Sequence, residues 1–229
     1  MAKKEIHEDL EVVKVGFANG VAEGFPLNDK QKDKMINQAE KAYGKFLDAL
    51  KCDWRNDPNS METPRRVAKA YVNDLWAGRY TAMSPITSFP SDGYDGIVIE
   101  RNIPLTSMCS HHHQTIKGVV HIGYIAGENG QVVGLSKLNR IVELFGRRGA
   151  IQEQLTSAIH NATSKITEGN KGVIVTIVAT HNCVSCRGVK HEGASMVTTK
   201  ASGVFRENNN LARKEFFDSL KVNNGGHQV

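Results

Sequence analysis

The feature that most constrains the fold is a run of apolar and β-branched residues from Val173 to Thr180, bounded by Gly172 and a polar segment. Such a run is typical of a buried strand. Residues 97–99 and 115–125 are also rich in β-branched residues, and residues 195–205 form another candidate strand. The chain must therefore form a sheet, with residues 173–180 as its most strongly indicated strand.

Helical periodicity precedes this sheet and alternates with its strands. Apolar residues in 28–50 recur at spacings of three and four. Thr63 and Pro64 indicate the start of a second helix, with Thr63 as its cap. Gly78 indicates the end of this helix. Further helices are expected over 136–145, with Ser136 as cap, and over 151–166 and 211–220. Helices first, then strands alternating with helices, predict an α+β chain with one sheet.

Composition excludes several classes of protein. Hydrophobic residues make up 40% and charged residues 23%, as in an ordinary soluble globular protein. No apolar run reaches the roughly 18 residues of a membrane span, and the charged N-terminus does not resemble a secretion signal. Four cysteines are too few for a secreted disulfide scaffold. We expect a cytoplasmic protein without a membrane partner, whose net charge of +5 permits an anionic ligand.

The segment Cys109-Ser110-His111-His112-His113 is the first candidate for chemistry. Thiolate and neutral imidazole are ligands that zinc prefers, and the spacing of Cys109 and His112 lets both reach one ion across a turn. In an extended segment Cys109, His111 and His113 would instead share a face. A polar loop with a chance run of histidines is the competing interpretation.

The second candidate segment, His181-Asn182-Cys183-Val184-Ser185-Cys186-Arg187-Gly188, directly follows the strongest strand. Cys183 and Cys186 could complete a closed four-ligand zinc site with Cys109 and His112, and spacing does not distinguish this from an open three-ligand site. A redox pair is disfavoured because its βαβ context is missing. A zinc deaminase is excluded because no His-x-Glu precedes these cysteines. Cys52 is expected to be a buried packing residue.

Several cations lie where an anion would bind. Lys137 and Arg140 fall in the first turns of a predicted helix, and Arg65 and Arg66 open another. Arg187 stands four residues after Cys183. This arrangement suits a polyphosphate near a metal, although solvated helix charges would give the same pattern. Glu153, near a helix start, either interacts with the helix dipole or accepts hydrogen bonds from a guanine.

Together, five segments resemble the GTP cyclohydrolase I family. They lie in the family's order within residues 28–220, and only their combination is specific. The segments are Glu-Thr-Pro-Arg-Arg-Val-Ala-Lys-Ala (62–70), Cys-Ser-His-His-His (109–113), Gly-Leu-Ser-Lys-Leu-Asn-Arg-Ile-Val (134–142), Gln-Glu-Gln-Leu-Thr (152–156) and His-Asn-Cys-Val-Ser-Cys-Arg-Gly (181–188).

The resemblance implies a tunnelling fold, in which an antiparallel sheet carries helices on one face and follows an N-terminal helical hairpin. It also implies a homodecamer with active sites between subunits and no nucleic-acid partner. The expected organisation is an arm (1–27), a helical region (28–90), a catalytic domain (91–221) and a tail (222–229).

The resemblance further implies that Cys109, His112 and Cys183 bind one zinc ion per subunit, with the fourth position open to water and Cys186 unused. The remaining site residues divide by role. His111 and His181 would be catalytic, Gln152 and Glu153 would read guanine, and the triphosphate would be bound by Ser136, Lys137, Arg140, Arg187 and a neighbouring subunit's Arg66.

The family's reaction converts GTP and water to 7,8-dihydroneopterin triphosphate and formate, a first step towards pterins, folate or 7-deazaguanine. Ser110 replaces the family's usual glutamate, so a catalytically altered relative is a competing hypothesis. A nitrile reductase of the same fold is a second, and a basic nucleotide-binding module with a structural zinc is a third. The nitrile reductase explains neither the Cys/His/Cys set nor the triphosphate cations.

Overall fold

The computed structural model describes residues 4–6, 15–17, 19–207 and 211–221. The expected tail, 222–229, and parts of the expected arm lie outside the described residues. Helix α1 (Asp29–Ala49) begins where predicted: the Asn28 side chain accepts a hydrogen bond from the Gln31 backbone N–H, and the Gln31 side chain accepts one from the Asn28 N–H. This reciprocal cap fixes the start of the longest helix.

The second helical segment differs in detail from its prediction. Helix α2 (Thr63–Ala70) includes Thr63 as a helical residue, and the capping position falls on Glu62, so the assignment of Thr63 as cap is wrong. Pro64 lies in the first turn, where its missing N–H removes no helical hydrogen bond. The helix then widens into a π-helical turn, η1 (Tyr71–Leu75), and a short 3-10 turn, η2 (Ala77–Arg79).

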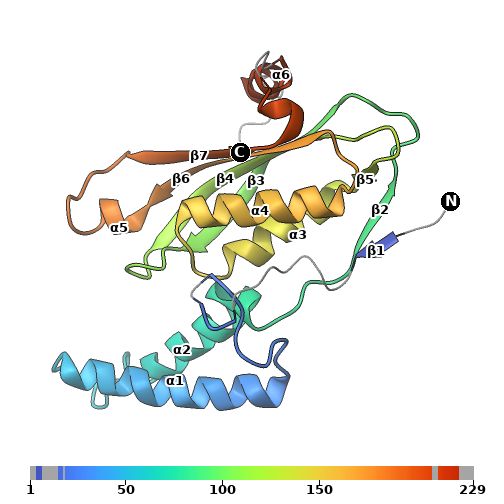
Figure 1. Ribbon diagram of the computed structural model, residues 1–229. Coiled ribbons are helices and arrows are strands. Elements are labelled where there is room, and N and C mark those ends of the chain that lie inside the picture. Colours follow the sequence, from blue (N-terminus) through green and yellow to red (C-terminus); the bar gives the residue numbers. More distant parts are fainter. Residues whose placement is uncertain (1–3, 7–14, 18, 208–210, 222–229) are drawn as a thin grey trace.

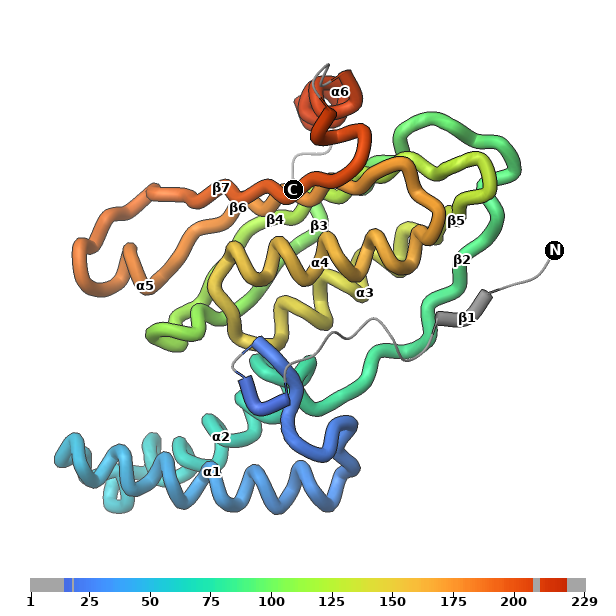
Figure 2. Tube along the Cα trace, in the orientation of Figure 1, coloured from blue at the N-terminus to red at the C-terminus, as the bar shows by residue number. Residues whose placement is uncertain are grey.

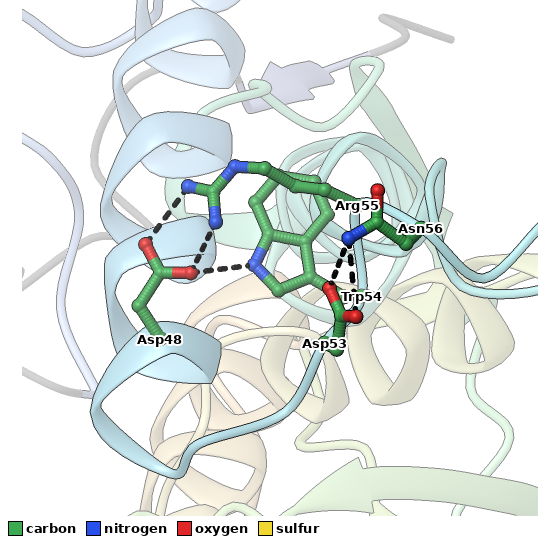
Figure 3. Close-up of polar contacts among 5 residues, drawn as sticks. All are labelled: Asp48, Asp53, Trp54, Arg55 and Asn56. Atoms are coloured by element: carbon green, nitrogen blue, oxygen red, sulfur yellow. Dashed lines mark hydrogen bonds and ion pairs between the residues drawn. The ribbon is translucent and has the colours of Figure 1, made fainter.

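The segment between α1 and α2 folds back on the end of α1 (Figure 3). The Asp48 carboxylate accepts hydrogen bonds from the Trp54 indole N–H at 2.9 Å and from the Arg55 guanidinium, which also lies over the Trp54 ring. The Arg55 and Trp54 contacts hold the pKa of Asp48 below its usual value. Cys52, in the same segment, is exposed, so its expected burial is wrong.

The main sheet has four antiparallel strands in the order β3-β4-β6-β7. Their bounds are Ile97–Met108 (β3), Thr115–Ile125 (β4), Gly172–His181 (β6) and Ser195–Ala201 (β7). The predicted strand over 195–205 is shorter than expected, because residues 203–205 form a 3-10 turn, η3 (Gly203–Phe205). The run at 173–180 is indeed a central, buried strand.

Helices α3 (Leu135–Gly146) and α4 (Gln152–Ile166) pack side by side on one face of this sheet (Figure 1). Their apolar faces meet alternate residues of β4 and β6 in the largest core cluster, which includes Ile141, Ile159 and Ile177. Helix α3 begins one residue earlier than predicted, with Gly134 at the capping position, so Ser136 is not the cap. Helix α6 (Leu211–Lys221) crosses the opposite face through Phe216.

Three short strands and one short helix were not predicted. Strands β1 (Lys4–Ile6), β2 (Ile86–Pro90) and β5 (Gln131–Val133) form a second antiparallel sheet, so the expectation of one sheet is wrong. Helix α5 (Asn182–Ser185) is a single helical turn. Figure 2 traces β2 as the link between the N-terminal helices and the main sheet. None of the described helices combines the length and apolarity of a membrane span.

The predicted α+β class, with an antiparallel sheet, helices α3 and α4 on one face and N-terminal helices before it, is confirmed. The domain boundaries at residues 27, 90 and 221 stay predictions.

Close packing of β4 against β6 predicts that Gly118→Ala destabilises the fold. A Cβ atom at Gly118 would lie 2.0 Å from the Val178 carbonyl oxygen, so the two central strands would have to separate. We expect a loss of at least about 2 kcal/mol in the free energy of unfolding, measured in urea at fixed protein concentration.

Gly134→Ala is the matched control, because a Cβ there meets nothing within 4 Å. It should cost less than about 1 kcal/mol. Equal effects of the two substitutions would contradict this account of the sheet.

Candidate metal centre

Two segments that are far apart in sequence meet at one end of the main sheet. The β3–β4 pairing ends with Met108 opposite Thr115, so residues 109–114 form the loop that joins these strands. In the β4–β6 pairing, Ile116 lies opposite His181, the last residue of β6. The register of β4 therefore brings the two histidine- and cysteine-containing segments together.

The first segment is a tight turn. The Cys109 N–H donates to the Gln114 carbonyl oxygen and the His113 N–H donates to the Cys109 carbonyl oxygen, each at 2.9 Å. This turn puts Cys109 and His112 on the same side of the loop, as the spacing argument required. The expectation for an extended segment, with Cys109, His111 and His113 on one face, is wrong.

Cys109, His112 and Cys183 form a candidate metal site. Their ligand atoms all lie within 4.8 Å of one another, although the residues differ in exposure: Cys109 is buried, Cys183 partly buried and His112 exposed. Ligand atoms of one tetrahedral zinc ion lie roughly 3.3 to 3.8 Å apart, so movements of about an ångström bring the three together. Two thiols and an imidazole are a donor set that suits zinc.

The electrostatics of the two thiols also fit a cation. Burial, and then the neighbouring Cys109 thiol, raise the pKa of the Cys183 thiol, whereas Arg187 opposes this shift. One buried and one partly buried thiol side by side thus disfavour negative charge unless they share a positive ion. A divalent metal supplies that charge and favours both thiolates.

Cys186 is not part of this ligand group among the described residues. The one-turn helix α5 carries Cys183, and Cys186 directly follows it, with its thiol 3.5 Å from the Gln114 side-chain oxygen. This placement favours an open three-ligand site over a closed four-ligand site. All four cysteines of the chain are free thiols.

His181 lies beside the first turn of α4. Its Nε2 atom is 2.7 Å from the side-chain oxygen of Gln152. The Gln152 amide nitrogen, in turn, donates to the carbonyl oxygens of Ile177 and Met196. Because these oxygens only accept, the Gln152 side-chain oxygen must face His181, and His181 Nε2 must be the donor. The Nδ1 atom of the neutral ring is then left with its lone pair.

The surroundings of His181 favour the neutral ring. Burial lowers the pKa of His181, and the nearby Glu153 carboxylate partly opposes this shift. Glu153 itself is exposed in the first turn of α4, whereas the Gln152 side chain is only 1% exposed. The structure thus brings His181, Gln152 and Glu153 together. His111 is exposed, with its ring 6.2 Å from that of His112.

The predicted anion-binding cations are divided between two places. Arg187 is exposed and close enough to Cys183 to influence its pKa. Ser136, Lys137 and Arg140 lie in the first half of α3, which starts beside β5, whereas the end of α3 approaches the metal end of the sheet (Figure 1). Twelve helical residues span about 18 Å, so α3 separates most of these cations from the metal ligands.

The two arginines that open α2 differ. Arg65 is tied to α1 through Glu40, at 2.9 Å, and Asn37, so it joins the two helices. Arg66 is exposed. Sequence reasoning missed two features: the Gln152–His181 contact, and the packing of Tyr71 and Trp76 against His113. No local pattern signals either, because both join segments that only the fold brings together.

Comparison with known proteins agrees with this geometry. A model of the family "GTP cyclohydrolase I" matches residues 39–221. The chain belongs to the GTP cyclohydrolase I family. The GTP cyclohydrolase 1 of Aeromonas salmonicida (strain A449) is 39% identical over 197 residues, covering 85% of this chain and 87% of the relative. That of Mycobacterium tuberculosis (strain ATCC 25177 / H37Ra) is 40% identical over 173 residues, covering 75% and 84%.

Among solved structures, the archaeosine synthase QueF-Like in its apo form aligns with 47% of this chain and 93% of its own, at a TM-score of 0.38 and 16% identity. The family match spans all five motif segments, and it includes the three candidate ligands. Membership in the GTP cyclohydrolase I family, rather than the spacing of its cysteines, decides against the nitrile reductase hypothesis.

The open site predicts different effects for Cys183, in α5, and Cys186, directly after it. Cys183→Ala should lose zinc, because it removes a ligand from a three-ligand site. Cys186→Ala should keep about one zinc per chain, since Cys186 stands outside the ligand group. Zinc per chain, measured by atomic emission after extensive dialysis, tests both variants. Zinc loss in Cys186→Ala would instead indicate a closed four-ligand site.

Proposed function

We propose that this chain is a zinc-dependent GTP cyclohydrolase I. In the proposed reaction, GTP and one water give formate and 7,8-dihydroneopterin triphosphate through opening of the purine ring at C8. The observation that carries the proposal is the Cys109, His112 and Cys183 donor set beside His181, in a chain of this family. Free thiols of all four cysteines suit a reducing compartment, in keeping with a cytoplasmic enzyme.

In this proposal Cys109, His112 and Cys183 hold one zinc ion per subunit, and Cys186 is not a ligand. Zinc at this position would supply a Lewis acid and lower the pKa of water towards about 7, providing a nucleophile for C8 at neutral pH. Cys109 is buried, and Cys183, in the helical turn α5 directly after β6, is partly buried. His112 is the exposed member, held through the turn of residues 109–114.

His181 and His111 would move protons. With Nε2 bound to Gln152, His181 presents Nδ1 as the atom that takes up or releases a proton. Protonation of the purine N7 makes C8 more electrophilic, and later steps of ring opening and reclosure again need proton transfers. Imidazole titrates in the range that such steps require. His111, exposed beside His112, is the second candidate.

Glu153 would recognise guanine, because an exposed carboxylate can accept hydrogen bonds from N1–H and the exocyclic amine together. Gln152 has less freedom. Its amide nitrogen is occupied by strands β6 and β7, so only a remaining lone pair of its oxygen is open to the base. We therefore give Gln152 the additional role of orienting His181.

The triphosphate would be bound by the cations. Arg187 stands beside the metal ligands of its own subunit. Ser136, Lys137, Arg140 and Arg66 lie elsewhere on the chain, and α3 alone spans about 18 Å. A second copy of the chain would bring this cationic set to the metal end, which supports an active site between subunits of a homo-oligomer. A homodecamer is the assembly that the family resemblance implies.

The proposed reaction predicts formate release from GTP that depends on zinc. Purified protein should release formate and a product with pterin fluorescence after oxidation. A chelator should abolish both, and added zinc should restore them, because the metal supplies the nucleophile. The control is Cys186→Ala, which should behave as the unmodified protein. A folded, zinc-loaded protein that releases no formate would overturn the proposed activity and point to an altered relative with Ser110.

A shared active site predicts complementation between two inactive variants. Cys183→Ala removes the metal and Arg140→Ala weakens triphosphate binding, so each homo-oligomer should have little activity. After co-refolding of equal amounts, random assembly should restore about one quarter of the sites, since each needs one intact half from each of two subunits.

Mixing the variants without dissociating them is the control, and it should restore nothing. If co-refolded mixtures also stay inactive while both variants co-assemble, the cations and the metal of one site come from the same subunit.

A further inference from the structure

His113 is held in an unusual backbone conformation at the end of the metal-binding turn. Its φ angle is +52°, in the left-handed region that residues other than glycine rarely adopt. Its N–H closes the turn on the Cys109 carbonyl oxygen. Such a conformation persists where surrounding contacts hold it. The side chain of His113 therefore needs partners that fix it from outside the loop.

Those partners come from the N-terminal helical region. The His113 ring lies edge-on to Trp76, with ring centroids 5.0 Å apart, and 5.9 Å from the ring of Tyr71. The Tyr71 hydroxyl is 3.3 Å from His113 Nδ1. The direction of this hydrogen bond depends on the tautomer of the His113 ring. We call Tyr71, Trp76 and His113 the aromatic clasp.

The aromatic clasp is anchored on its far side to the main sheet. Trp76 packs against Gly149, where an added Cβ would lie 2.6 Å from the indole nitrogen. The Gly78 N–H donates to the Arg147 carbonyl oxygen at 3.0 Å, and the Ala150 N–H donates to the Met108 carbonyl oxygen at 3.1 Å. Met108 directly precedes Cys109. The contacts thus form a closed path from one end of the turn, through the 147–150 segment and Trp76, to the other end.

We propose that His113 is a positioning residue that holds the exposed ligand His112 in place for zinc through the aromatic clasp. This inference rests on the proposed zinc site. Cys109 is buried and Cys183 is partly buried in α5, whereas His112 is exposed and lies directly before His113. Fixing His113 limits the conformations of the turn before the metal binds. Preorganisation of this kind raises affinity without an additional ligand.

Two substitutions of His113 distinguish the contribution of its ring from that of its backbone conformation. His113→Asn keeps a residue that tolerates positive φ but removes the aromatic contacts. The zinc dissociation constant should rise about two- to tenfold, as expected for the loss of an aromatic pair contact. His113→Phe keeps an aromatic ring but loses both ring nitrogens, and with Nδ1 the contact to Tyr71, so its dissociation constant should stay within about threefold of the unmodified value. Competition with a chromogenic chelator measures each constant.

The spectrum of the cobalt-substituted protein gives a readout that a purely structural role would not change. His113→Asn should shift the cobalt d–d bands, because the His112 imidazole changes its position relative to the metal. The thiolate charge-transfer band should remain, because the two thiolates keep their positions. Lys51→Asn is the matched control, at another left-handed position, φ +59°, just after α1. It should leave both the spectrum and the dissociation constant unchanged.

The outcomes distinguish the two proposals. If the unmodified protein binds no zinc, the zinc site and this inference both fail. If the unmodified protein binds zinc and His113→Asn binds it equally, with an unchanged cobalt spectrum, the zinc site stands and the inference alone is overturned. A variant that unfolds more easily without metal, yet binds zinc as before once folded, would also overturn the positioning role.

Discussion

The register of β4 against its two neighbours is the constraint on which the rest of the structure depends. Pairing of Met108 with Thr115 and of Ile116 with His181 brings a hairpin loop and a strand end to the same edge. A shift of one residue would turn every side chain of β4 to the other face and bury the wrong set. Buried residues on β4 and β6 prevent that shift. The hydrophobic core therefore places the candidate metal site: Cys109 belongs to this core and Cys183 packs against it.

The segment between α3 and α4 connects the paired strands to the polar side chains of the candidate site. Arg147 and Ala150 bind the backbone of Gly78 and Met108, and Gln152, two residues later, binds His181. Buried polar groups must be satisfied, so each of these contacts leaves little freedom to its neighbours. The buried Gln152 side chain fixes which nitrogen of His181 carries the proton. For the catalytic role proposed for His181, one defined tautomer would prepare the ring for proton transfer before substrate arrives.

The sequence predicts those parts of the molecule whose signal is local. The β-branched run of β6, the start of α1 and the turn spacing of Cys109 and His112 are all visible in short windows. Strands β1, β2 and β5 are not predictable in this way, because three to five residues carry too little periodicity. The exposure of Cys52 depends on how the Trp54 segment folds back, which is a tertiary effect. The clasp around His113 likewise joins residues more than 35 positions apart.

The proposed division of the active site between subunits follows from how precisely each part of the site must be placed. Zinc ligands must be placed to within a few tenths of an ångström, which strand pairing inside one chain provides. Arginine and lysine bind phosphate through long side chains, whose reach absorbs larger errors in placement. Cationic residues such as Arg140 and Arg66 are exposed, whereas Cys109 is buried. An interface between copies therefore suits the triphosphate better than the metal, so in the proposed enzyme the fold would hold the metal and the assembly would bind the triphosphate.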